Sequence, residues 1–317
     1  MKNMSSPEIN IQTLKKFSEF TFEIRQFFHS QNFLEATTPT LVECPGTEPF
    51  LEPFATEFRF GKKIKKFYLP TSPEIALKKL ICQGSGSVFE IKNVFRNNEL
   101  SQHHSPEFLM LEWYRVNFSI EQIQKDIQEL LQSLLKKKSF SISKKTMREL
   151  FLEFTGFELT PSTTQAEYYS LALKNNLNVK SDETIEDLFS LIFLELIEKK
   201  LDKDVPLFVT DYPPFQAAYA QINNSGWAER FEFYWKGLEI ANAFYEVTDA
   251  DEQLQRMQKD NLLKRSLGKE EVTLDLEFIE LMKKGMPKSS GVALGVERLF
   301  MAIHNFQDIQ TIFCRDY

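Results

Sequence analysis

The sequence predicts an α+β fold, because two antiparallel hairpins are separated by blocks of amphipathic helix. The first hairpin spans residues 87–117 and the second spans residues 231–244. Along the second strand of the first hairpin, alternate residues share a face: Phe108, Met110, Glu112 and Tyr114 on one side, and Leu109, Leu111, Trp113 and Arg115 on the other. A period of two residues is typical of a strand within a sheet.

Three elements are expected before the first hairpin. Apolar side chains at helical spacing predict an amphipathic helix over residues 9–30. Four prolines then interrupt regular structure and leave short extended pieces: Pro39, Pro45, Pro49 and Pro53. A strand ending near Leu69 leads into a helix with Ser72 as N-cap, Pro73 at its first position and Gly84 as its stop.

Beyond the first hairpin, residues 119–138 predict a strongly amphipathic helix. A helical insertion is expected at about 139–204, with helices over 143–154, 165–174 and 184–199. The second hairpin has its tight turn near Trp235 and Lys236, and a polar helix over 249–261 follows. A strand with Gly291 and Gly295 then leads into a helix from about Val296. We expect one domain over residues 1–317.

Composition excludes several classes of protein. The net charge of −7 does not favour extended contact with nucleic acid. No run of 18 apolar residues and no signal peptide are visible, so we expect a cytoplasmic protein without membrane contact. The odd number of widely spaced cysteines (Cys44, Cys82, Cys314) predicts neither disulfides nor a thiolate metal site, and the four histidines argue against zinc.

A few charged residues interrupt apolar surfaces. Glu112 lies beside Phe108 and Met110, which is costly unless the carboxylate faces a pocket with a cationic or hydrogen-bonding partner. Glu74 and Arg298 each fall in the first turn of a predicted helix. Glu74 has the alternative role of a carboxylate that complements the helix dipole, whereas Arg298 there would favour a bound anion.

The second hairpin contains a pair of acidic residues. We expect Glu232 and Glu239 to lie about opposite each other across it, where like charges repel. A magnesium ion that bridges substrate phosphates would make this arrangement favourable. The alternative is an exposed face on which both carboxylates are solvated.

These segments resemble the catalytic domain of class II aminoacyl-tRNA synthetases. Its three motifs occur in order: FLEATTP ending at Pro39, FR at Phe95 and Arg96 through EFLMLEWY, and GVALGVERL. TSPE, HHSPEF, ERFEFY, GLEIANAF and YEVTDADEQLQR resemble the lysine-specific branch. The resemblance implies a mostly antiparallel sheet flanked by helices, with the Pro39 motif at the two-fold interface of a homodimer.

Within that class, the closest resemblance is to the elongation factor P–(R)-β-lysine ligase family. The segment before Pro39 is too short for the anticodon-binding domain of lysyl-tRNA synthetases, and Ala293 replaces their glycine. We therefore expect no such domain and no stable tRNA binding. The family is an ATP-dependent, AMP-forming ligase that uses Mg²⁺, activates (R)-β-lysine and attaches it to elongation factor P. The alternatives are a truncated lysine-activating enzyme with another acceptor and a non-catalytic regulatory paralogue.

The resemblance also implies roles for individual residues. Arg96 and Arg298 would be catalytic, because guanidinium groups match phosphate oxygens. ATP binding is implied for Arg96, Asn97, Asn98, His104, Ser105, Phe108, Glu239, Ile240, Gly295 and Arg298. Magnesium binding is implied for Glu232 and Glu239. Binding of the amino-acid substrate is implied for Ser72, Pro73, Glu74, Glu112, Tyr114, Asn242, Glu246 and Ala293.

Three positions within these motifs carry particular weight. The methyl group of Ala293 would crowd the α-amine of ordinary lysine, although a small residue in a strand is also unremarkable. Asn98 replaces a glutamate that accepts from the adenine amino group, and either its side-chain oxygen or Glu99 would take over that contact. Ser105 replaces the usual asparagine after His104.

Overall fold

The computed structural model describes residues 10–312. The chain divides into two compact units, one formed by 1–140 and 247–317 and the other by 141–246. Each unit is described by itself below. The single domain expected over 1–317 stays a prediction.

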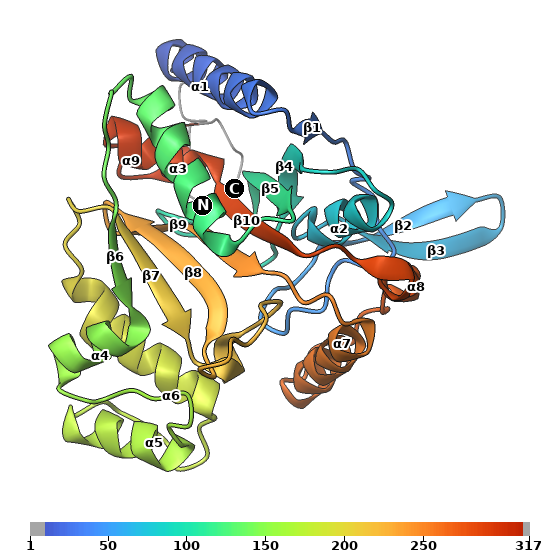
Figure 1. The fold of residues 1–317 in the computed structure, drawn as a ribbon. Helices are drawn as coiled ribbons and strands as arrows, with labels where there is room; N and C mark the ends of the chain where they lie inside the picture. The colour runs from blue at the N-terminus through green and yellow to red at the C-terminus, as the bar shows by residue number, and fades with distance from the viewer. Residues whose placement is uncertain (1–9, 313–317) are drawn as a thin grey trace, which may run out of the picture. The chain divides into compact units, whose positions relative to one another are not determined.

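The first unit is built on strands that lie in the order β1 (Leu34–Glu35), β4 (Val88–Phe95), β5 (Glu107–Val116) and β10 (Ser289–Gly295) (Figure 1). The short β1 runs parallel to β4, whereas the pairs β4–β5 and β5–β10 are antiparallel. The first hairpin predicted from the sequence is therefore present, and so is the small-residue strand. The expected α+β fold with a mostly antiparallel sheet is confirmed.

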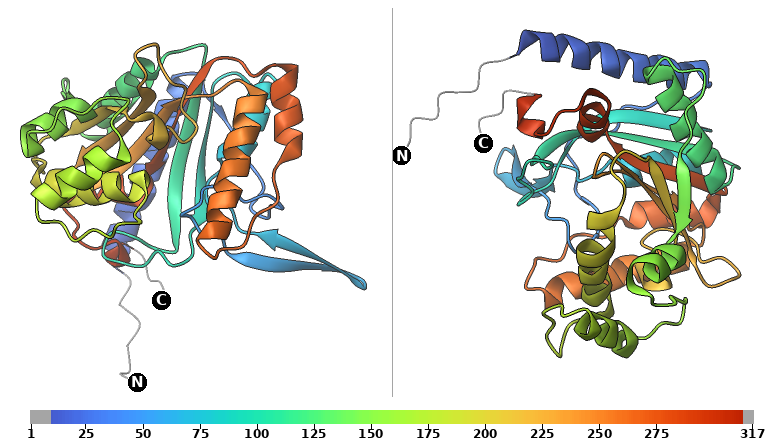
Figure 2. Two further views of the ribbon diagram at one scale, coloured as in Figure 1. Left: turned by 90° about the horizontal axis from the view of Figure 1, so that it is seen from below. Right: turned by 90° about the vertical axis from the view of Figure 1, so that its left-hand side faces the viewer.

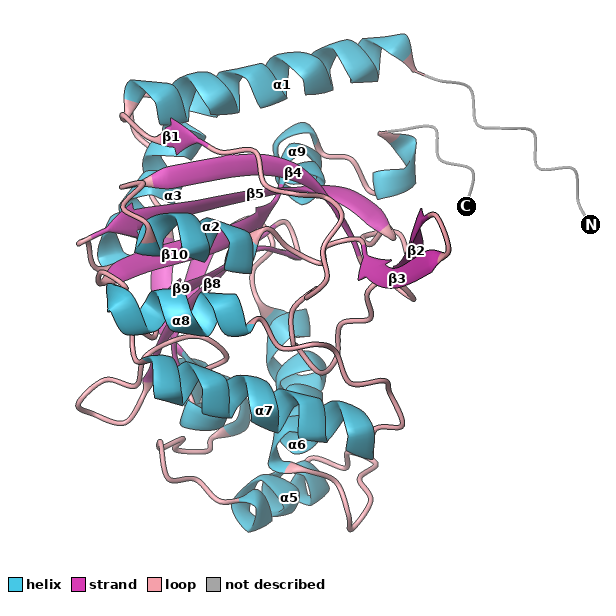
Figure 3. Ribbon diagram, turned by 90° about the vertical axis from the view of Figure 1, so that its right-hand side faces the viewer, coloured by secondary structure: helices cyan, strands magenta, loops and turns pink. Residues whose placement is uncertain are grey.

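Helices cover both faces of these strands. α1 (Ile11–Ser30), α3 (Ile120–Leu134) and α9 (Val296–His304) lie on one face, and α2 (Glu74–Cys82) lies on the other (Figure 3). Trp113 identifies the first face, because its ring packs 5.1 Å from that of Phe28 in α1 and its Nε1 donates to Asp126 in α3. Since side chains alternate along β5, the neighbouring Glu112 points to the α2 face.

The remaining elements of the first unit lie outside this layer. α7 (Ala250–Ser266) and α8 (Leu276–Gly285) pack on each other, and α8 packs on α2. Strands β2 (Ala55–Phe60) and β3 (Lys63–Tyr68) form a separate hairpin that extends away from the other strands of the unit (Figure 2).

The second unit contains strands in the order β9 (Leu238–Tyr245), β8 (Ala228–Trp235), β7 (Leu207–Tyr212) and β6 (Ser143–Thr146). β6 and β7 are parallel and the other pairs are antiparallel. The second predicted hairpin is present. Lys236 and Gly237 both have positive φ, +56° and +75°, as a two-residue hairpin turn requires.

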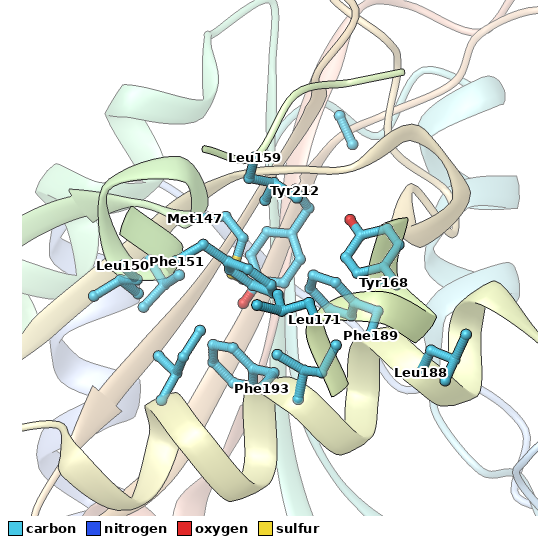
Figure 4. Packing of buried hydrophobic residues seen from close by; sticks show 14 of the residues in the cluster. Met147, Leu150, Phe151, Leu159, Tyr168, Leu171, Leu188, Phe189, Phe193 and Tyr212 are labelled. Carbon is cyan, nitrogen blue, oxygen red and sulfur yellow. The ribbon is translucent and has the colours of Figure 1, made fainter. Parts of the chain in front are cut away.

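Helices α4 (Met147–Thr155), α5 (Gln165–Lys174) and α6 (Ile185–Ile192) bury an aromatic cluster in the second unit (Figure 4). The rings of Phe151 and Phe189 stack 5.6 Å apart, and Tyr168 meets Phe189 edge-on at 6.0 Å. Each helix begins with a capping box, in which Thr146, Thr164 and Thr184 accept from the backbone three residues on. The starts of these three helices are therefore determined by residues close together in the sequence.

Several predicted boundaries differ from the structure. The helix expected over 143–154 begins as strand β6, and the helix expected over 184–199 continues from α6 as a π-helix (Phe193–Ile197) and a 3₁₀-helix (Glu198–Lys200). Two further 3₁₀ turns lie at Pro214–Gln216 and Ile309–Thr311. The prediction of Ser72 as N-cap is wrong: Pro73 occupies that position and α2 begins at Glu74.

Two features named from the sequence, Ile9 and Cys314, lie outside the described residues. Cys44 and Cys82 are both free thiols. None of the helices between residues 10 and 312 has the length and apolar character that would let it span a bilayer.

Candidate active site

Arg96 follows directly after β4 and is fixed in position by the surrounding backbone. Its Nε donates to the carbonyl of Thr71 at 3.3 Å, and its own N–H donates to the carbonyl of Pro106 at 2.8 Å. The guanidinium carbon lies 5.2 Å from the centre of the Phe108 ring, within cation–π range. Arg96 and Phe108, both predicted for ATP binding, are therefore neighbours.

The loop between β4 and β5 brings a second arginine close to His104. Arg298, in the first turn of α9, donates through Nε to the carbonyl of His103 at 3.2 Å. Burial, followed by the charges of Arg298, His103 and Arg96, lowers the pKa of His104 to about 4. The ring is thus neutral at pH 7, and its Nδ1 lies 2.8 Å from Ser101 Oγ. A positive potential from Arg96 and Arg298 at one loop suits a polyanion.

Glu52 holds the two asparagines that follow Arg96. Its oxygens accept from the side-chain amides of Asn97 at 3.0 Å and Asn98 at 2.6 Å. Asn98 has a φ of +64°, which asparagine tolerates better than most residues. The side-chain oxygen of Asn98 remains an acceptor, while Glu99 lies 4.0 Å from Arg96 Nη1. Sequence reasoning gave Glu52 no role.

Glu297 connects the start of α9 to β5 and was also missed. It is 1% exposed, and both its oxygens accept from the backbone N–H of Leu109, at 2.9 and 3.0 Å. This bond places Arg298 and Phe108, the residues next to its two ends, in fixed relation. The sequence does carry a signal for such a role, because Glu297 interrupts the apolar run of GVERLF.

Glu112, Tyr114 and Ala293 share one face of the first unit's sheet. Glu112 is 1% exposed and accepts from Tyr114 Oη at 3.1 Å. Ala293 of β10 is the direct cross-strand partner of Glu112, and Gly291 and Gly295 are the partners of Tyr114 and Met110. Because directly opposite residues share a face, small residues line one side of the buried carboxylate. Ala293 and Gly295 are partly accessible, although the residues around them are buried.

The start of α2 carries the predicted Ser72, Pro73 and Glu74. Glu74 forms an ion pair with the buried Lys78, with 2.5 Å between Oε1 and Nζ. Ser72 Oγ accepts from the backbone N–H of Glu74 at 3.4 Å. Glu74 therefore has a structural partner one turn along its helix, in addition to its position in the first turn.

Glu48 is a further acidic group near Glu74. Burial, and next the charge of Glu74, raise the pKa of Glu48 to about 7, whereas Arg96 opposes this shift. Thr47, the preceding residue, donates to Asp260 in α7 at 3.0 Å. The sequence gave no reason to select Glu48, because the charges that act on it lie in distant segments.

In the second unit, Glu232 is the centre of a buried hydrogen-bond network. Its Oε2 accepts from Tyr212 Oη at 2.5 Å and from Tyr234 Oη at 2.6 Å, and its Oε1 pairs with Arg230. Arg230 also donates to Asn242 Oδ1 at 3.1 Å. Burial, and next the charge of Glu232, raise the pKa of both phenols well above the usual value, so they remain donors.

The expected opposition of Glu232 and Glu239 is wrong. The turn lies at Lys236–Gly237, one residue later than expected, so Glu239 pairs with Tyr234. A bulge between Phe233 and Tyr234 shifts the register by one further residue, so Glu232 pairs with Asn242. Ile240 is buried, and Glu246, 1% exposed, follows the end of β9. Arg230, the cation beside Glu232, was not predicted from the sequence.

The carboxylate oxygens of β8 and β9 can be assessed as ligands for a magnesium ion. A carboxylate offers about four lone-pair sites, and three of those on Glu232 are used by Arg230, Tyr212 and Tyr234. One site on Oε1 remains for a hard cation, so Glu232 fits as a monodentate ligand. Between residues 10 and 312, no three Asp, Glu, His or Cys side chains cluster as a preformed metal site. The ion would have to take most of its ligands from elsewhere, as Mg²⁺ commonly does with water and phosphate.

The comparisons with known proteins decide the family. The model of "tRNA synthetases class II (D, K and N)" matches residues 4–314. The chain belongs to this family. Its second and third motifs supply β4 through β5 and the β10–α9 junction, which bring Arg96 and Arg298 next to the same loop.

Curated relatives narrow the resemblance further. The chain is 39% identical to a protein of Haemophilus ducreyi over 96% of this chain and 94% of the relative. It is 38% identical to one from Haemophilus influenzae (98% and 96%) and 38% identical to one from Pasteurella multocida (93% and 92%). All three are named elongation factor P–(R)-β-lysine ligase.

Proposed function

We propose that this class II synthetase homologue activates (R)-β-lysine with ATP and transfers it to the ε-amine of a lysine of elongation factor P. Relatives with this name align over nearly the whole chain. The observation that carries the proposal is the position of Ala293, directly opposite the buried Glu112. A methyl group there narrows the space on the substrate face of the sheet, and by the family resemblance it would crowd the α-amine of ordinary lysine while leaving room for an amine displaced by one carbon.

Specificity for the amino acid follows from its two ammonium groups. We assign the side-chain amine to Glu112, Tyr114 and Glu246, and the other amine to Glu74, with Ser72 and Pro73 shaping the turn before α2. Asn242 is assigned to the substrate carboxylate. A buried carboxylate left without its ammonium partner is costly, so substrates that lack the distal amine are expected to be rejected strongly.

We assign the nucleotide to the arginine loop of the first unit. Arg96 and Arg298 would bind phosphate oxygens, Phe108 would stack on adenine, and Asn97, Asn98, His104, Ser105 and Gly295 would complete the contacts. In the second unit we assign Glu239 and Ile240 to the nucleotide and Glu232 and Glu239 to Mg²⁺. When bound, Mg²⁺ neutralises charge on the phosphates. The arginines do the same from fixed positions, which lowers the cost of negative charge in the transition state.

The reaction has two steps. The substrate carboxylate attacks the α-phosphorus of ATP, a P–O bond forms, and pyrophosphate leaves. The neutral ε-amine of the acceptor lysine then attacks the adenylate carbonyl, AMP leaves, and the new amide nitrogen loses one proton. The residues named above contribute chiefly by holding the reacting groups in line and by compensating charge.

ATP–pyrophosphate exchange tests the first step. We expect exchange with (R)-β-lysine and much weaker exchange with L-lysine. Mass spectrometry of purified, unmodified elongation factor P after incubation tests the second step, with a mass gain of one lysine residue as the expected result. Exchange with neither amino acid would refute the proposal. Exchange without modification of the factor would assign another acceptor.

We also propose that the protein is a cytoplasmic homodimer that does not bind tRNA stably. Light scattering after size exclusion measures the mass in solution, and a monomer at micromolar concentration would contradict the dimer. Gel-shift experiments with tRNA(Lys) test the last point, with elongation factor P as the positive control for binding.

A further inference from the structure

A row of three residues crosses the first unit's sheet. Glu90 of β4 is directly opposite Glu112 of β5, and Glu112 is directly opposite Ala293 of β10. Directly opposite residues in antiparallel strands have Cβ atoms about 4.5–5.5 Å apart and point to the same face. Glu90 is 3% exposed and Glu112 is 1% exposed. Two buried carboxylates are therefore neighbours.

Two such groups cannot both carry a charge without compensation. Like charges at this distance repel, and burial makes an uncompensated charge more costly. The pair would then share a proton, and the pocket would carry less negative charge than the substrate ammonium requires. Compensation of Glu90 therefore removes one charge that would oppose the ionisation of Glu112.

Lys92 is the group in a position to compensate Glu90. It lies two residues further along β4, so it shares the face of Glu90, and it is 6% exposed. Its Nζ lies 3.4 Å from Glu90 Oε1 and donates to the carbonyl of Thr38 at 2.5 Å. A lysine so deeply buried is rare unless it has a partner of this kind.

Thr38 fixes the orientation of Glu90. Its backbone N–H donates to Glu90 Oε1 at 2.9 Å, and its hydroxyl donates to Glu90 Oε2 at 2.7 Å. Both oxygens of Glu90 are therefore bound by Thr38 and Lys92. The segment that ends at Pro39 thereby acquires a direct connection to the substrate face of β4 and β5.

The other elements on this face contribute few further charges. β5 provides Tyr114, whose hydroxyl donates to Glu112, and β10 provides Ser289, Gly291, Ala293 and Gly295, none of which carries a charge. α2, which packs on this face through Leu77 and Ile81, carries Lys78 in an ion pair with Glu74. Among the first unit's strands on this face, Lys92 is the cation next to Glu90.

We propose that Thr38, Glu90 and Lys92 form a charge-compensated triad that keeps Glu112 ionised for the side-chain ammonium of the substrate. The triad residues are positioning residues and bind no substrate themselves. The role of Glu112 toward the ammonium rests on the proposed function, whereas the effect of Lys92 on the ionisation of Glu112 does not.

Lys92→Met provides the first test. The variant leaves two carboxylates to share one proton, so the KM for (R)-β-lysine in pyrophosphate exchange should rise about 10- to 100-fold at pH 7. The KM for ATP should change little, and the loss should diminish as the pH is raised. An unchanged KM for (R)-β-lysine in the folded variant would overturn the proposal.

The double variant Glu90→Gln with Lys92→Met separates charge from packing. It removes both charges of the triad, so the KM should return to within a few-fold of the wild-type value. A purely structural role predicts instead that the double variant is no better than Lys92→Met. That result would also overturn the proposal.

A direct titration keeps the test independent of activity. Carboxyl ¹³C NMR, with the Glu112 signal assigned by its absence in Glu112→Gln, should show a higher pKa for Glu112 in Lys92→Met than in the wild type. The double variant should reverse the shift. If the wild type shows no exchange with (R)-β-lysine, the proposed function fails but this titration still decides the triad. An identical Glu112 titration in all three proteins would refute it.

Discussion

The Glu297 carboxylate accepts two hydrogen bonds from the backbone N–H of Leu109, at 2.9 and 3.0 Å. The two residues are 188 positions apart in the chain. This bond lies between Phe108, at the start of β5, and Arg298, in the first turn of α9. The position of Arg298 relative to the loop at His104 therefore depends on a residue that itself faces the protein interior.

We expect Glu297→Gln to fold, because the amide oxygen can still accept from the backbone N–H of Leu109. We expect the side chain of Arg298 to be held less firmly in this variant. The kcat/KM for ATP should fall about tenfold, while the KM for (R)-β-lysine stays near the wild-type value. Pyrophosphate exchange at varied ATP measures both. A matched control is Glu280→Gln on the exposed side of α8, which should leave both constants unchanged. A Glu297→Gln enzyme with wild-type ATP kinetics would show that the Leu109 contact does not position Arg298.

Ala293→Gly should widen tolerance for ordinary lysine. Removing the methyl opposite Glu112 is expected to raise kcat/KM for L-lysine about 10- to 100-fold, with a smaller change for (R)-β-lysine. Parallel exchange assays with the two amino acids provide the ratio. An unchanged ratio would show that the methyl is incidental to selectivity.

Glu48 makes the stability of the protein depend on pH. The ordinary pKa of the carboxyl is 4.5, and the folded protein raises it to about 7. Between these values the unfolded chain loses the proton that the folded chain retains, so stability falls as the pH rises from about 4.5 to 7. Glu48→Gln should therefore match the wild type at pH 4 and exceed it at pH 8 by about 3 kcal/mol.

Urea denaturation at several pH values measures this difference. Glu57→Gln is the control, because Glu57 lies exposed on the β2–β3 hairpin and should show no pH-dependent difference. A Glu48→Gln variant that is less stable than the wild type at pH 8 would reverse the sign and refute the argument.

Arg230→Met should destabilise the second unit strongly. The change leaves the carboxylate of Glu232, 7% exposed, without its cation, and breaking such a pair costs about 3–5 kcal/mol. The double variant Arg230→Met with Glu232→Gln should recover most of the lost free energy of unfolding, which urea denaturation measures. Equal stability of Arg230→Met and the wild type would show that Tyr212 and Tyr234 suffice to stabilise the charge.

Local sequence signals predicted the elements better than the contacts between them. The helix over 165–174 has the predicted bounds, because its capping box and periodicity lie within one segment. The second hairpin turns at Lys236–Gly237, one residue later than predicted, and the bulge between Phe233 and Tyr234 has no local signal, so the opposition of Glu232 and Glu239 was predicted wrongly. Similarly, Pro73 rather than Ser72 occupies the N-cap of α2.

The partners of the buried charges could not be predicted for the same reason. Glu90 was passed over because its partner Thr38 is 52 residues away. Arg230 was passed over because the predicted strand began at Phe231, whereas β8 begins at Ala228 and places Arg230 on the same face as Glu232. The resemblance to class II synthetases supplied the individual site residues. The structure adds the groups around them: Glu52, Glu297, Lys92 and Arg230.

The three consecutive capping boxes of α4, α5 and α6 have a consequence for the order of folding. Each box joins residues only three apart, so it can form before any distant strand has paired. By contrast, β5 can pair with β10 only after Ser289–Gly295 has been synthesised, about 200 residues after β4 begins at Val88. We expect residues 147–192 to acquire helix while the nascent chain is still incomplete, and to provide an early nucleus in the middle of a slowly assembling protein.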